Sequence, residues 1–206
     1  MAKLRFISGV MGSSKSLRLL VTAHDLDEKN IPILVIKPSI DTRDGIDIVK
    51  SRVGLERECV SIDPTLNIFN VVNDMIHMMM VRMEKPIEWI LVDECQFLTK
   101  EQVDQLSDVV DYLNIEVICY GLKTDFMSKL FPASKRLLEI ADLHEELKTF
   151  CDCGNKALVN ARIRQDGSII TEGNQILVGG DDKYKAMCRK CWKEKIKKDS
   201  FDKNLE

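Results

Sequence analysis

The sequence has no excess of basic residues and few aromatic ones. Its 206 residues carry 30 Lys and Arg against 33 Asp and Glu, which gives a formal net charge of −3, and only 6% of the residues are aromatic. A protein whose main task is to coat a nucleic-acid backbone needs a basic face. The composition therefore argues against such a protein, although it is compatible with a local basic patch.

Long hydrophobic runs are also missing. No stretch approaches the roughly 20 apolar residues that a membrane helix needs. The apolar start of the chain stops at Gly9 and Gly12, without the length or the small-residue cleavage site of a signal peptide. We therefore expect a cytoplasmic protein with no membrane partner. In that reducing compartment the seven cysteines are expected to be thiols or metal ligands rather than disulfides.

The sequence has few histidines and neither internal repeats nor low-complexity linkers. The three histidines, His24, His77 and His144, are scattered and support no Ser-His-Asp arrangement. A chain of this length can bury roughly 70% of the surface that it exposes when unfolded, which is enough for one good core and a small appendage.

Apolar runs alternate with helical patterns through the first three quarters of the chain. The predicted strands cover residues 3–8, 31–37, 87–92 and 115–120, and the predicted helices cover residues 15–29, 66–82 and 99–113. At the start of the last of these helices, Thr99 and Gln102 form a capping-box pattern. This order predicts an α/β fold with a parallel sheet and flanking helices. Ligands in such sheets bind beyond the carboxyl ends of the strands.

The pattern changes at Cys151. Between Cys151 and Trp192 too few apolar residues remain for an independent core, and turn signals such as Asp166-Gly167 favour a hairpin between residues 157–164 and 168–173. We therefore divide the chain into three parts. They are an α/β domain at residues 1–150, a small subdomain at residues 151–192, and a charged tail at residues 193–206 that is expected to be a fraying helix end or disordered.

The first chemical motif lies between the first predicted strand and the first predicted helix. It follows the phosphate-binding pattern G-x-x-x-x-G-K-S, except that Ser14 stands where the second glycine is expected. Backbone N–H groups of such a loop surround a phosphate, Lys15 contacts the β- and γ-phosphate oxygens, and the Ser16 hydroxyl binds Mg²⁺. The alternative is a glycine-rich turn without a ligand, and serine costs on the order of 1–3 kcal/mol if position 14 needs a positive φ. The predicted loop consists of Gly9, Val10, Met11, Gly12, Ser13, Ser14, Lys15 and Ser16.

Two adjacent carboxylates follow the third apolar run. Asp93 and Glu94 stand where a phosphate-loop protein places the acidic residue that holds Mg²⁺. Because neighbouring side chains point in different directions, one carboxylate can serve the metal while the other acts as a general base. An acidic pair after a strand can also be an ordinary solvated loop start, but the phosphate loop on the first strand makes the metal-binding interpretation stronger.

Four cysteines occur as two close pairs in the part of the chain without a core. Two pairs of thiolates suit a tetrahedral structural zinc site, although the first pair has one residue fewer between its members than the favoured C-x-x-C spacing. The alternatives are unligated thiols or a redox C-x-x-C motif. The predicted ligands are Cys151, Cys153, Cys188 and Cys191. The other cysteines, which have no metal-binding spacing and are expected to fill apolar space, are Cys59, Cys95 and Cys119.

Taken together, these motifs resemble those of the thymidine kinases of the cytosolic, zinc-containing type (type II), in particular the bacterial members. The resemblance runs from about Phe6 to Trp192. Its markers are the phosphate loop, the two cysteine pairs and residues 41–43, 51–55, 91–99, 119–126 and 179–184. The Asp-Glu-Cys-Gln-Phe stretch at residues 93–97 is highly diagnostic of the family.

The resemblance implies a role for each of these sites. Glu94 would take the proton from the thymidine 5′-hydroxyl, Ser16 and Asp93 would arrange Mg²⁺, and Arg43 would steady the transferring phosphoryl group. Besides the phosphate loop, the implied ATP and Mg²⁺ site comprises Arg43, Asp93, Glu94, Cys95 and Gln96. The implied thymidine site comprises Met11, Phe97, Leu122, Phe126, Phe131, Val178 and Tyr184.

The implied activity is the transfer of the γ-phosphate of ATP to thymidine, which gives dTMP for DNA synthesis. A P-loop NTPase-like domain and a small zinc-ribbon-like subdomain are the implied fold, with Mg²⁺ and a structural Zn²⁺ as cofactors. A homotetramer and feedback by thymidine triphosphate would also follow. Two alternatives stay open, namely a P-loop ATPase with a mechanical or regulatory role and a zinc-ribbon nucleic-acid-binding module that uses the basic stretch Lys190–Lys198.

Overall fold

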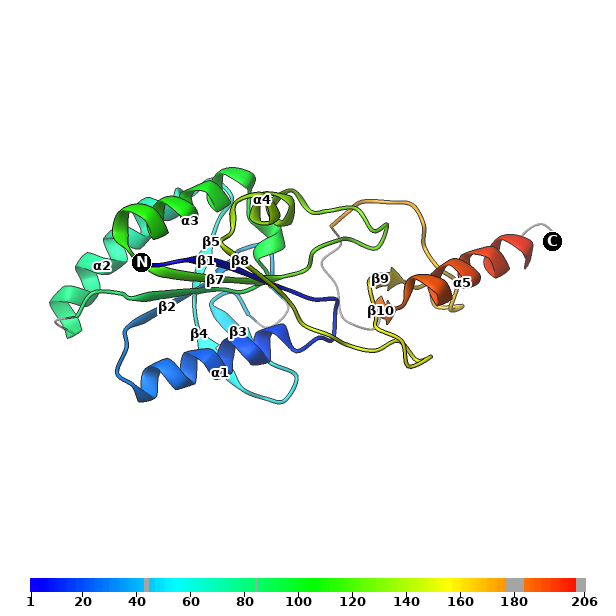
Figure 1. Ribbon diagram of the computed structural model, residues 1–206, viewed down its shortest axis with the longest axis horizontal. Coiled ribbons are helices and arrows are strands. Elements are labelled where there is room, and N and C mark those ends of the chain that lie inside the picture. Colours follow the sequence, from blue (N-terminus) through cyan, green and yellow to red (C-terminus); the bar gives the residue numbers. More distant parts are fainter. Residues whose placement is uncertain (43–44, 84, 177–183, 203–206) are drawn as a thin grey trace.

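Six parallel strands form the central sheet of the computed structural model, which describes residues 1–42, 45–83, 85–176 and 184–202 (Figure 1). Their order in space is β5-β2-β6-β7-β1-β8. The strands are β1 (Leu4–Ser8), β2 (Ile33–Pro38), β5 (Val60–Ile62), β6 (Trp89–Val92), β7 (Glu116–Gly121) and β8 (Leu143–Glu146). The predicted parallel sheet and its α/β class are confirmed.

The four strands expected from apolar runs are β1, β2, β6 and β7, and they are largely buried because helices cover both faces of the sheet. The two strands that were not predicted lie at the edges. β5 has only three residues, and β8 reads Leu-His-Glu-Glu with its first three residues exposed. An edge strand that faces solvent needs no apolar run, so neither segment carried a strand signal.

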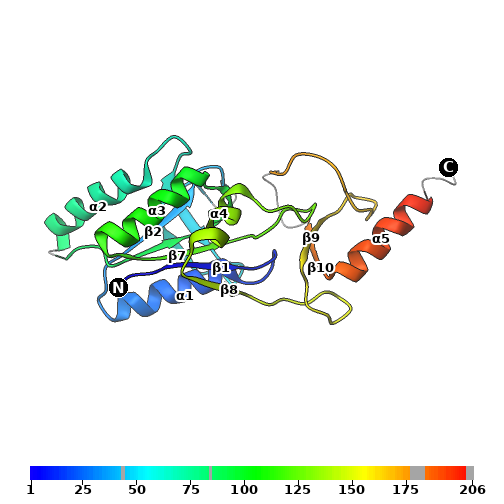
Figure 2. The same cartoon turned by 45° about the horizontal axis from the view of Figure 1, so that its top comes forward.

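Helices pack on both faces of the sheet (Figures 1 and 2). Leu34 and Ile36 of β2 join the core cluster on one face, whereas Ile33 and Val35 join the cluster on the other, as the alternation of side chains along a strand requires. The first face carries α2 (Ile68–Met83), α3 (Lys100–Leu113) and α4 (Pro132–Ile140). The second face carries α1 (Lys15–Glu28) and the β3–β4 hairpin (Ile48–Lys50 and Glu56–Glu58).

One short-range sequence signal was predicted correctly, and two short elements of the α/β domain were missed. The capping box is present as predicted, because the Thr99 hydroxyl accepts from the Gln102 N–H at 3.1 Å and the Gln102 side chain accepts from the Thr99 N–H at 3.1 Å. Helix α4 was not predicted, although it begins with Pro132 at its first position, where proline is favoured. The β3–β4 hairpin was missed as well, since its strands have three residues each.

The carboxyl ends of the sheet strands point toward a small second unit (Figures 1 and 2). It contains β9 (Val159–Arg162), the antiparallel β10 (Tyr184–Met187) and α5 (Arg189–Asp202). The turn predicted at Asp166-Gly167 is present, but it closes only an isolated bridge between Ile163 and Ile169, and the ladder partner of β9 is β10. Helix α5 continues from the cysteine-containing segment into the predicted tail as far as Asp202. The described residues contain no helix that is both long and apolar enough to cross a membrane.

Candidate active site

The phosphate loop connects the end of β1 to the start of α1. Gly12 has a φ of 76°, and Ser14 at the N-terminal end of α1 has a φ of 62°, so both residues adopt the left-handed conformation. The condition under which serine strains this loop is therefore met. The Ser14 side chain makes no capping hydrogen bond, so the first N–H groups of α1 receive no cap from it. A bound anion could accept hydrogen bonds from these groups.

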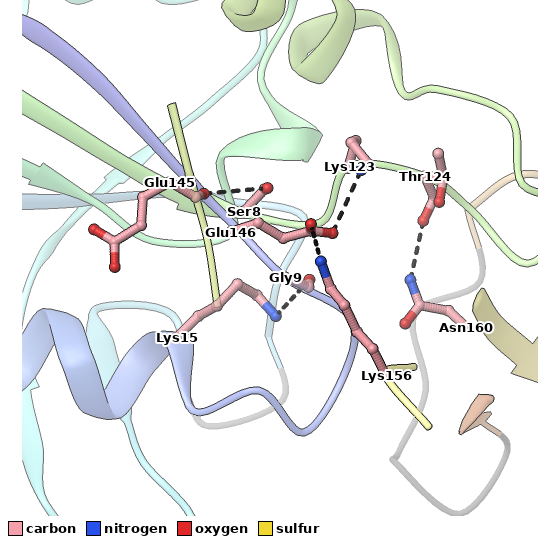
Figure 3. Close-up of polar contacts among 9 residues, drawn as sticks. All are labelled: Ser8, Gly9, Lys15, Lys123, Thr124, Glu145, Glu146, Lys156 and Asn160. Carbon is pink, nitrogen blue, oxygen red and sulfur yellow. Dashed lines mark hydrogen bonds and ion pairs between the residues drawn. The ribbon is translucent and has the colours of Figure 1, made fainter. Parts of the chain in front are cut away.

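Lys15 extends back into the loop from the first turn of α1. Its buried ammonium donates to the Gly9 carbonyl oxygen at 3.1 Å (Figure 3). It also donates to the Val10 carbonyl oxygen at 3.0 Å and to the Ser13 hydroxyl at 3.4 Å. These contacts hold a positive charge inside the curve of the loop. A phosphate group in the loop would therefore meet both the backbone N–H groups and this charge.

Ser16 and Asp93 meet at the carboxyl end of β6. The Ser16 hydroxyl lies 3.0 Å and 3.3 Å from the two carboxylate oxygens of Asp93. Burial and the neighbouring charge of Glu94 raise the pKa of Asp93 to about 7, while the hydroxyl of Ser16 and the charge of Lys15 act in the opposite direction. A hydroxyl oxygen beside a buried carboxylate is a donor set that fits Mg²⁺.

Glu94 directly follows Asp93 and has an unusual backbone. Its φ of 48° is left-handed, and the chain then enters the short 3-10 helix η1 (Cys95–Phe97). The buried side chain of Gln96 donates a hydrogen bond to the Glu94 carboxylate and accepts one from the Leu122 N–H at 2.8 Å. A side chain at Gly121 would collide with Gln96, because a Cβ there would lie 2.6 Å from its amide oxygen. The left-handed backbone of Glu94 and the hydrogen bond from Gln96 together fix the position of the Glu94 carboxylate.

A cavity of about 750 Å³ joins these elements. From the predicted sites, its lining includes Met11, Gly12, Ser14, Lys15, Ser16, Asp93, Glu94, Gln96, Phe97, Leu122, Phe126, Phe131 and Tyr184. Cys95 is fully buried in the core, so any contact of this residue with ATP or Mg²⁺ would use its main chain. Arg43 and Val178 lie outside the described residues.

One end of the cavity is aromatic. The rings of Phe97 and Phe131 meet edge to face, with centroids 6.0 Å apart and planes at 81°. The Arg162 guanidinium lies over the ring of Phe126, 5.4 Å from its centroid. Burial raises the pKa of the Tyr184 phenol. The aromatic end therefore suits a flat, uncharged ring, whereas the phosphate-loop end suits an anion.

Several lining residues were not predicted as site residues, although some of them lie in the segments that carry the family resemblance. Asp125 organises the loop after β7, because its carboxylate accepts from the N–H groups of Met127 at 2.8 Å and Lys129 at 2.9 Å and from the Gln175 amide at 3.0 Å. The hairpin tip brings Arg52 close to the phosphate loop. The other lining residues that were not predicted are Leu17, Asp41, Lys50, Ser51, Val53, Gly54, Asn160 and Ile176.

A buried lysine fixes the chain beyond β2. Lys37 is 1% exposed and donates to the carbonyl oxygens of Gly45 at 2.7 Å and Ile48 at 2.9 Å. Its ammonium also lies 4.0 Å from the Asp41 carboxylate, which lines the cavity. The segment that leads into the β3–β4 hairpin is therefore tied to the sheet next to the cavity.

The four predicted zinc ligands come together in the second unit. The sulfur atoms of Cys151, Cys153, Cys188 and Cys191 all lie within 4.8 Å of one another. The sulfurs of Cys153 and Cys188 are 3.6 Å apart, and Zn–S bonds of about 2.3 Å in a tetrahedron would place two sulfurs about 3.8 Å apart. The backbone and side-chain N–H groups of Asn155 lower the pKa of Cys153 to about 6, whereas hydrogen bonds with Cys153 and Cys188 raise the pKa of Cys191 to about 12. The cluster thus fits zinc.

Comparisons with known proteins agree with this geometry. A family model described as thymidine kinase matches residues 2–192. The chain is 46% identical over 198 residues to a thymidine kinase of Enterobacteria phage T4, with 96% of this chain and 99% of that one covered. It is 43% identical over 196 residues to a thymidine kinase of Rhodopirellula baltica, covering 95% and 90% of the two chains. A thymidine kinase of Vibrio cholerae is 44% identical over 197 residues, with 95% and 99% covered.

Proposed function

The chain belongs to the thymidine kinase family, and from that premise we propose that its cavity transfers the γ-phosphoryl group of ATP to the 5′-hydroxyl of thymidine. The observation that carries this proposal is the union, in one cavity, of a phosphate loop, two strand-end carboxylates and an aromatic slot. Phosphoryl transfer requires little covalent work of a protein, so positioning and charge stabilisation account for most of the catalysis.

The donor end would bind ATP through the phosphate loop. Backbone N–H groups between Gly9 and Ser16 would surround the phosphates, and Lys15 would stabilise the charge that spreads over the transferring group. Ser16 and Asp93 are the residues that would hold Mg²⁺. When bound, this ion neutralises phosphate charge and orients the γ-phosphoryl group. We propose that Arg43 contributes a further positive charge there.

The acceptor end would place thymidine with its base in the aromatic slot and its 5′-hydroxyl toward Glu94. The Glu94 carboxylate, held by Gln96, would accept the proton of this hydroxyl as the oxygen attacks the γ-phosphorus. General-base catalysis of this kind typically contributes about 10²–10⁴-fold to a rate. We propose base-binding contacts for Phe97, Phe126, Phe131 and Tyr184, and for Met11, Leu122 and Val178.

The zinc-binding unit supplies one side of the acceptor end. Tyr184 begins β10 and lines the cavity, and Cys188 and Cys191 follow at the end of that strand and in α5. Among its described residues, the unit has a buried apolar cluster of five, two of which are predicted zinc ligands. We therefore propose a structural Zn²⁺ that orders this side of the nucleoside site, because the apolar residues alone form too small a core.

The two alternative activities lack features that the transferase has. A P-loop ATPase has no use for the aromatic slot next to Glu94. The basic stretch of the nucleic-acid alternative lies on α5, where Glu194 interrupts it and lies 3.9 Å from the Lys190 ammonium. We propose that the protein has neither nucleic acid nor a membrane as its partner.

A nucleoside panel tests the proposed activity. Purified protein is incubated with ATP and Mg²⁺, and ADP formation is measured without a nucleoside and with thymidine, deoxyuridine, deoxycytidine or deoxyadenosine. We expect ADP formation to depend on thymidine and to yield dTMP in equal amount. ADP formation that is the same with and without thymidine would instead support the ATPase alternative.

Three finer properties rest on the family resemblance. We propose a homotetramer, feedback inhibition by thymidine triphosphate and a cytoplasmic location. Sedimentation velocity measures the first, and inhibition kinetics at fixed thymidine measures the second. Fractionation of the cells that produce the protein tests the third.

A further inference from the structure

Asn160 belongs to the zinc-binding unit, yet its side chain contacts two loops of the α/β domain. The residue lies on β9 and is 2% exposed. Its amide oxygen accepts a hydrogen bond from the Met11 N–H at 2.7 Å. Its amide nitrogen donates to the Thr124 carbonyl at 3.0 Å, the contact drawn in Figure 3. Because one partner is a donor and the other an acceptor, only one orientation of the amide satisfies both contacts.

The two partners belong to different loops beside the cavity. Met11 lies in the phosphate loop, between Gly9 and the strained Ser14, so its N–H belongs to the proposed ATP subsite although its side chain is a proposed contact of the base. Thr124 lies in the loop after β7, between the cavity-lining residues Leu122 and Phe126. Asn160 lines the same cavity. The buried amide of Asn160 thus joins the phosphate loop, the loop after β7 and the zinc-binding unit.

We propose that Asn160 is a positioning residue that couples the donor subsite to the acceptor subsite. The inference rests on the proposed function and adds a task that the family resemblance did not assign to this residue. When ATP orders the phosphate loop, Met11 holds the Asn160 amide in place, and the amide in turn holds the Thr124 loop against the nucleoside. Binding of ATP then orders part of the thymidine subsite, so thymidine loses less conformational entropy of the protein when it binds.

A second tie between the same units provides a matched control. The Glu146 carboxylate lies 3.4 Å from the Lys123 ammonium and also pairs with Lys156, so it connects the end of β8, the loop after β7 and the zinc-binding unit (Figure 3). None of these three side chains lines the cavity within the described part of the chain. We expect loss of this tie to loosen the docking of the zinc-binding unit and to leave the Met11 contact in place.

The coupling is measured as a ratio of two dissociation constants. Thymidine binding is titrated by calorimetry with and without a non-hydrolysable ATP analogue and Mg²⁺, for the unmodified protein, Asn160→Leu and Glu146→Gln. In the unmodified protein we expect the analogue to tighten thymidine binding at least about fivefold, at the low end of typical couplings. We expect Asn160→Leu to reduce the ratio to near one while its affinity for the analogue alone changes by less than about threefold. Glu146→Gln should keep the ratio of the unmodified protein.

A second variant at the same position distinguishes a loss of coupling from a folding defect. Asn160→Ser keeps a polar side chain but is too short to bridge both loops, and we expect it to lose the coupling as well. Melting curves and zinc content, compared among the variants, show whether the fold is intact. An unchanged ratio in either Asn160 variant, an equal loss in Glu146→Gln, or a ratio of one in the unmodified protein would overturn the inference.

The outcomes also separate the inference from the proposed function. If the unmodified protein transfers no phosphate to thymidine, the proposed function fails and the inference fails with it. If transfer is normal and the ratio is unaffected by the Asn160 substitutions, only the inference fails.

Discussion

The hydroxyl of Ser16 lies 3.0 Å from one carboxylate oxygen of Asp93 and 3.3 Å from the other. Ser16 is in the first turn of α1 and Asp93 follows the end of β6, so the contact spans 77 positions of the sequence. Strand β6 lies next to β7, which in turn pairs with β1, and the parallel register brings the carboxyl ends of all three to one edge. The proposed Mg²⁺ site is therefore a direct consequence of the sheet order.

Replacement of this hydroxyl tests the Mg²⁺ site. We expect Ser16→Ala to raise the Mg²⁺ concentration needed for half-maximal activity by about 10–100-fold, the usual effect of losing a group that binds or orients at a metal site. Ser16→Thr keeps the hydroxyl and should stay close to the unmodified protein. The measurement is initial rate against free Mg²⁺ at saturating ATP and thymidine. Equal Mg²⁺ dependence for the Ala and Thr variants would remove Ser16 from the site.

Glu94 is the proposed general base, and its carboxylate can be neutralised with little change in shape. We expect Glu94→Gln to lower kcat by about 10²-fold or more and to leave ATP-analogue binding nearly unchanged, because the proton acceptor is lost while the phosphate loop is intact. The measurements are steady-state kinetics and calorimetry. Glu88→Gln, which changes an exposed glutamate just before β6, serves as the control. A kcat equal to that of the control would exclude Glu94 as the base.

The hydrophobic pattern and the short motifs predicted the buried strands of the sheet, the phosphate loop and the cysteine cluster, whereas the aromatic residues of the cavity were named only through the family resemblance. Strands with apolar runs, the phosphate loop, the Asp-Glu pair and the cysteine spacing all depend on residues that are near one another in the sequence. Asn160 could not be found in this way, because its partner Met11 lies 149 positions away and a single asparagine in a strand carries no signal. The edge strand β8 was missed because it is exposed and charged.

Zinc removal should affect the second unit before it affects the sheet. Native mass spectrometry should find one zinc per chain. Chelation is expected to weaken thymidine binding and to increase hydrogen exchange in β9, β10 and α5, because their buried cluster is small and includes Cys151 and Cys188. Exchange in β1, β6 and β7 should stay low. A metal-free preparation with full activity would contradict the structural role of zinc.

Glu146 gives the protein a small stability contribution that depends on pH. The hydrogen bond from Lys156 and the charge of Lys123 lower the pKa of Glu146 below its usual 4.5. A lowered folded-state pKa means that this contribution is present above about pH 4.5 and is lost as the pH falls through the lowered value. Because the Glu146 side chain is 32% exposed, we expect less than about 1 kcal/mol.

The comparison for this pH effect is Glu145→Gln, which changes an exposed neighbour that points away from both lysines (Figure 3). The free energy of unfolding is measured by urea denaturation for both variants at pH 7 and at pH 3.5. We expect Glu146→Gln to be the less stable variant at pH 7 and the difference between the two variants to be smaller at pH 3.5. A difference that grows as the pH falls would contradict the assigned sign.

Ser14 provides the final prediction, because the structure contains a second serine with the same backbone strain. Ser14 has a φ of 62° and Ser128, in the loop after β7, has a φ of 61°. Replacing either serine by glycine should raise the free energy of unfolding by a similar amount, on the order of 1 kcal/mol, since glycine adopts this conformation without a steric penalty. Urea denaturation of the two variants measures this gain.

The two glycine variants should differ in their effect on ATP. Ser14 lies in the phosphate loop, so Ser14→Gly should bind an ATP analogue as well as the unmodified protein or better, whereas Ser128→Gly should leave binding unchanged. Lys15→Ala should weaken binding and nearly abolish transfer, because it removes the positive charge that the loop holds at its centre. If Ser14→Gly lost activity while Lys15→Ala kept it, residues 9–16 would not be the phosphate site and the proposed kinase mechanism would lose its main structural support.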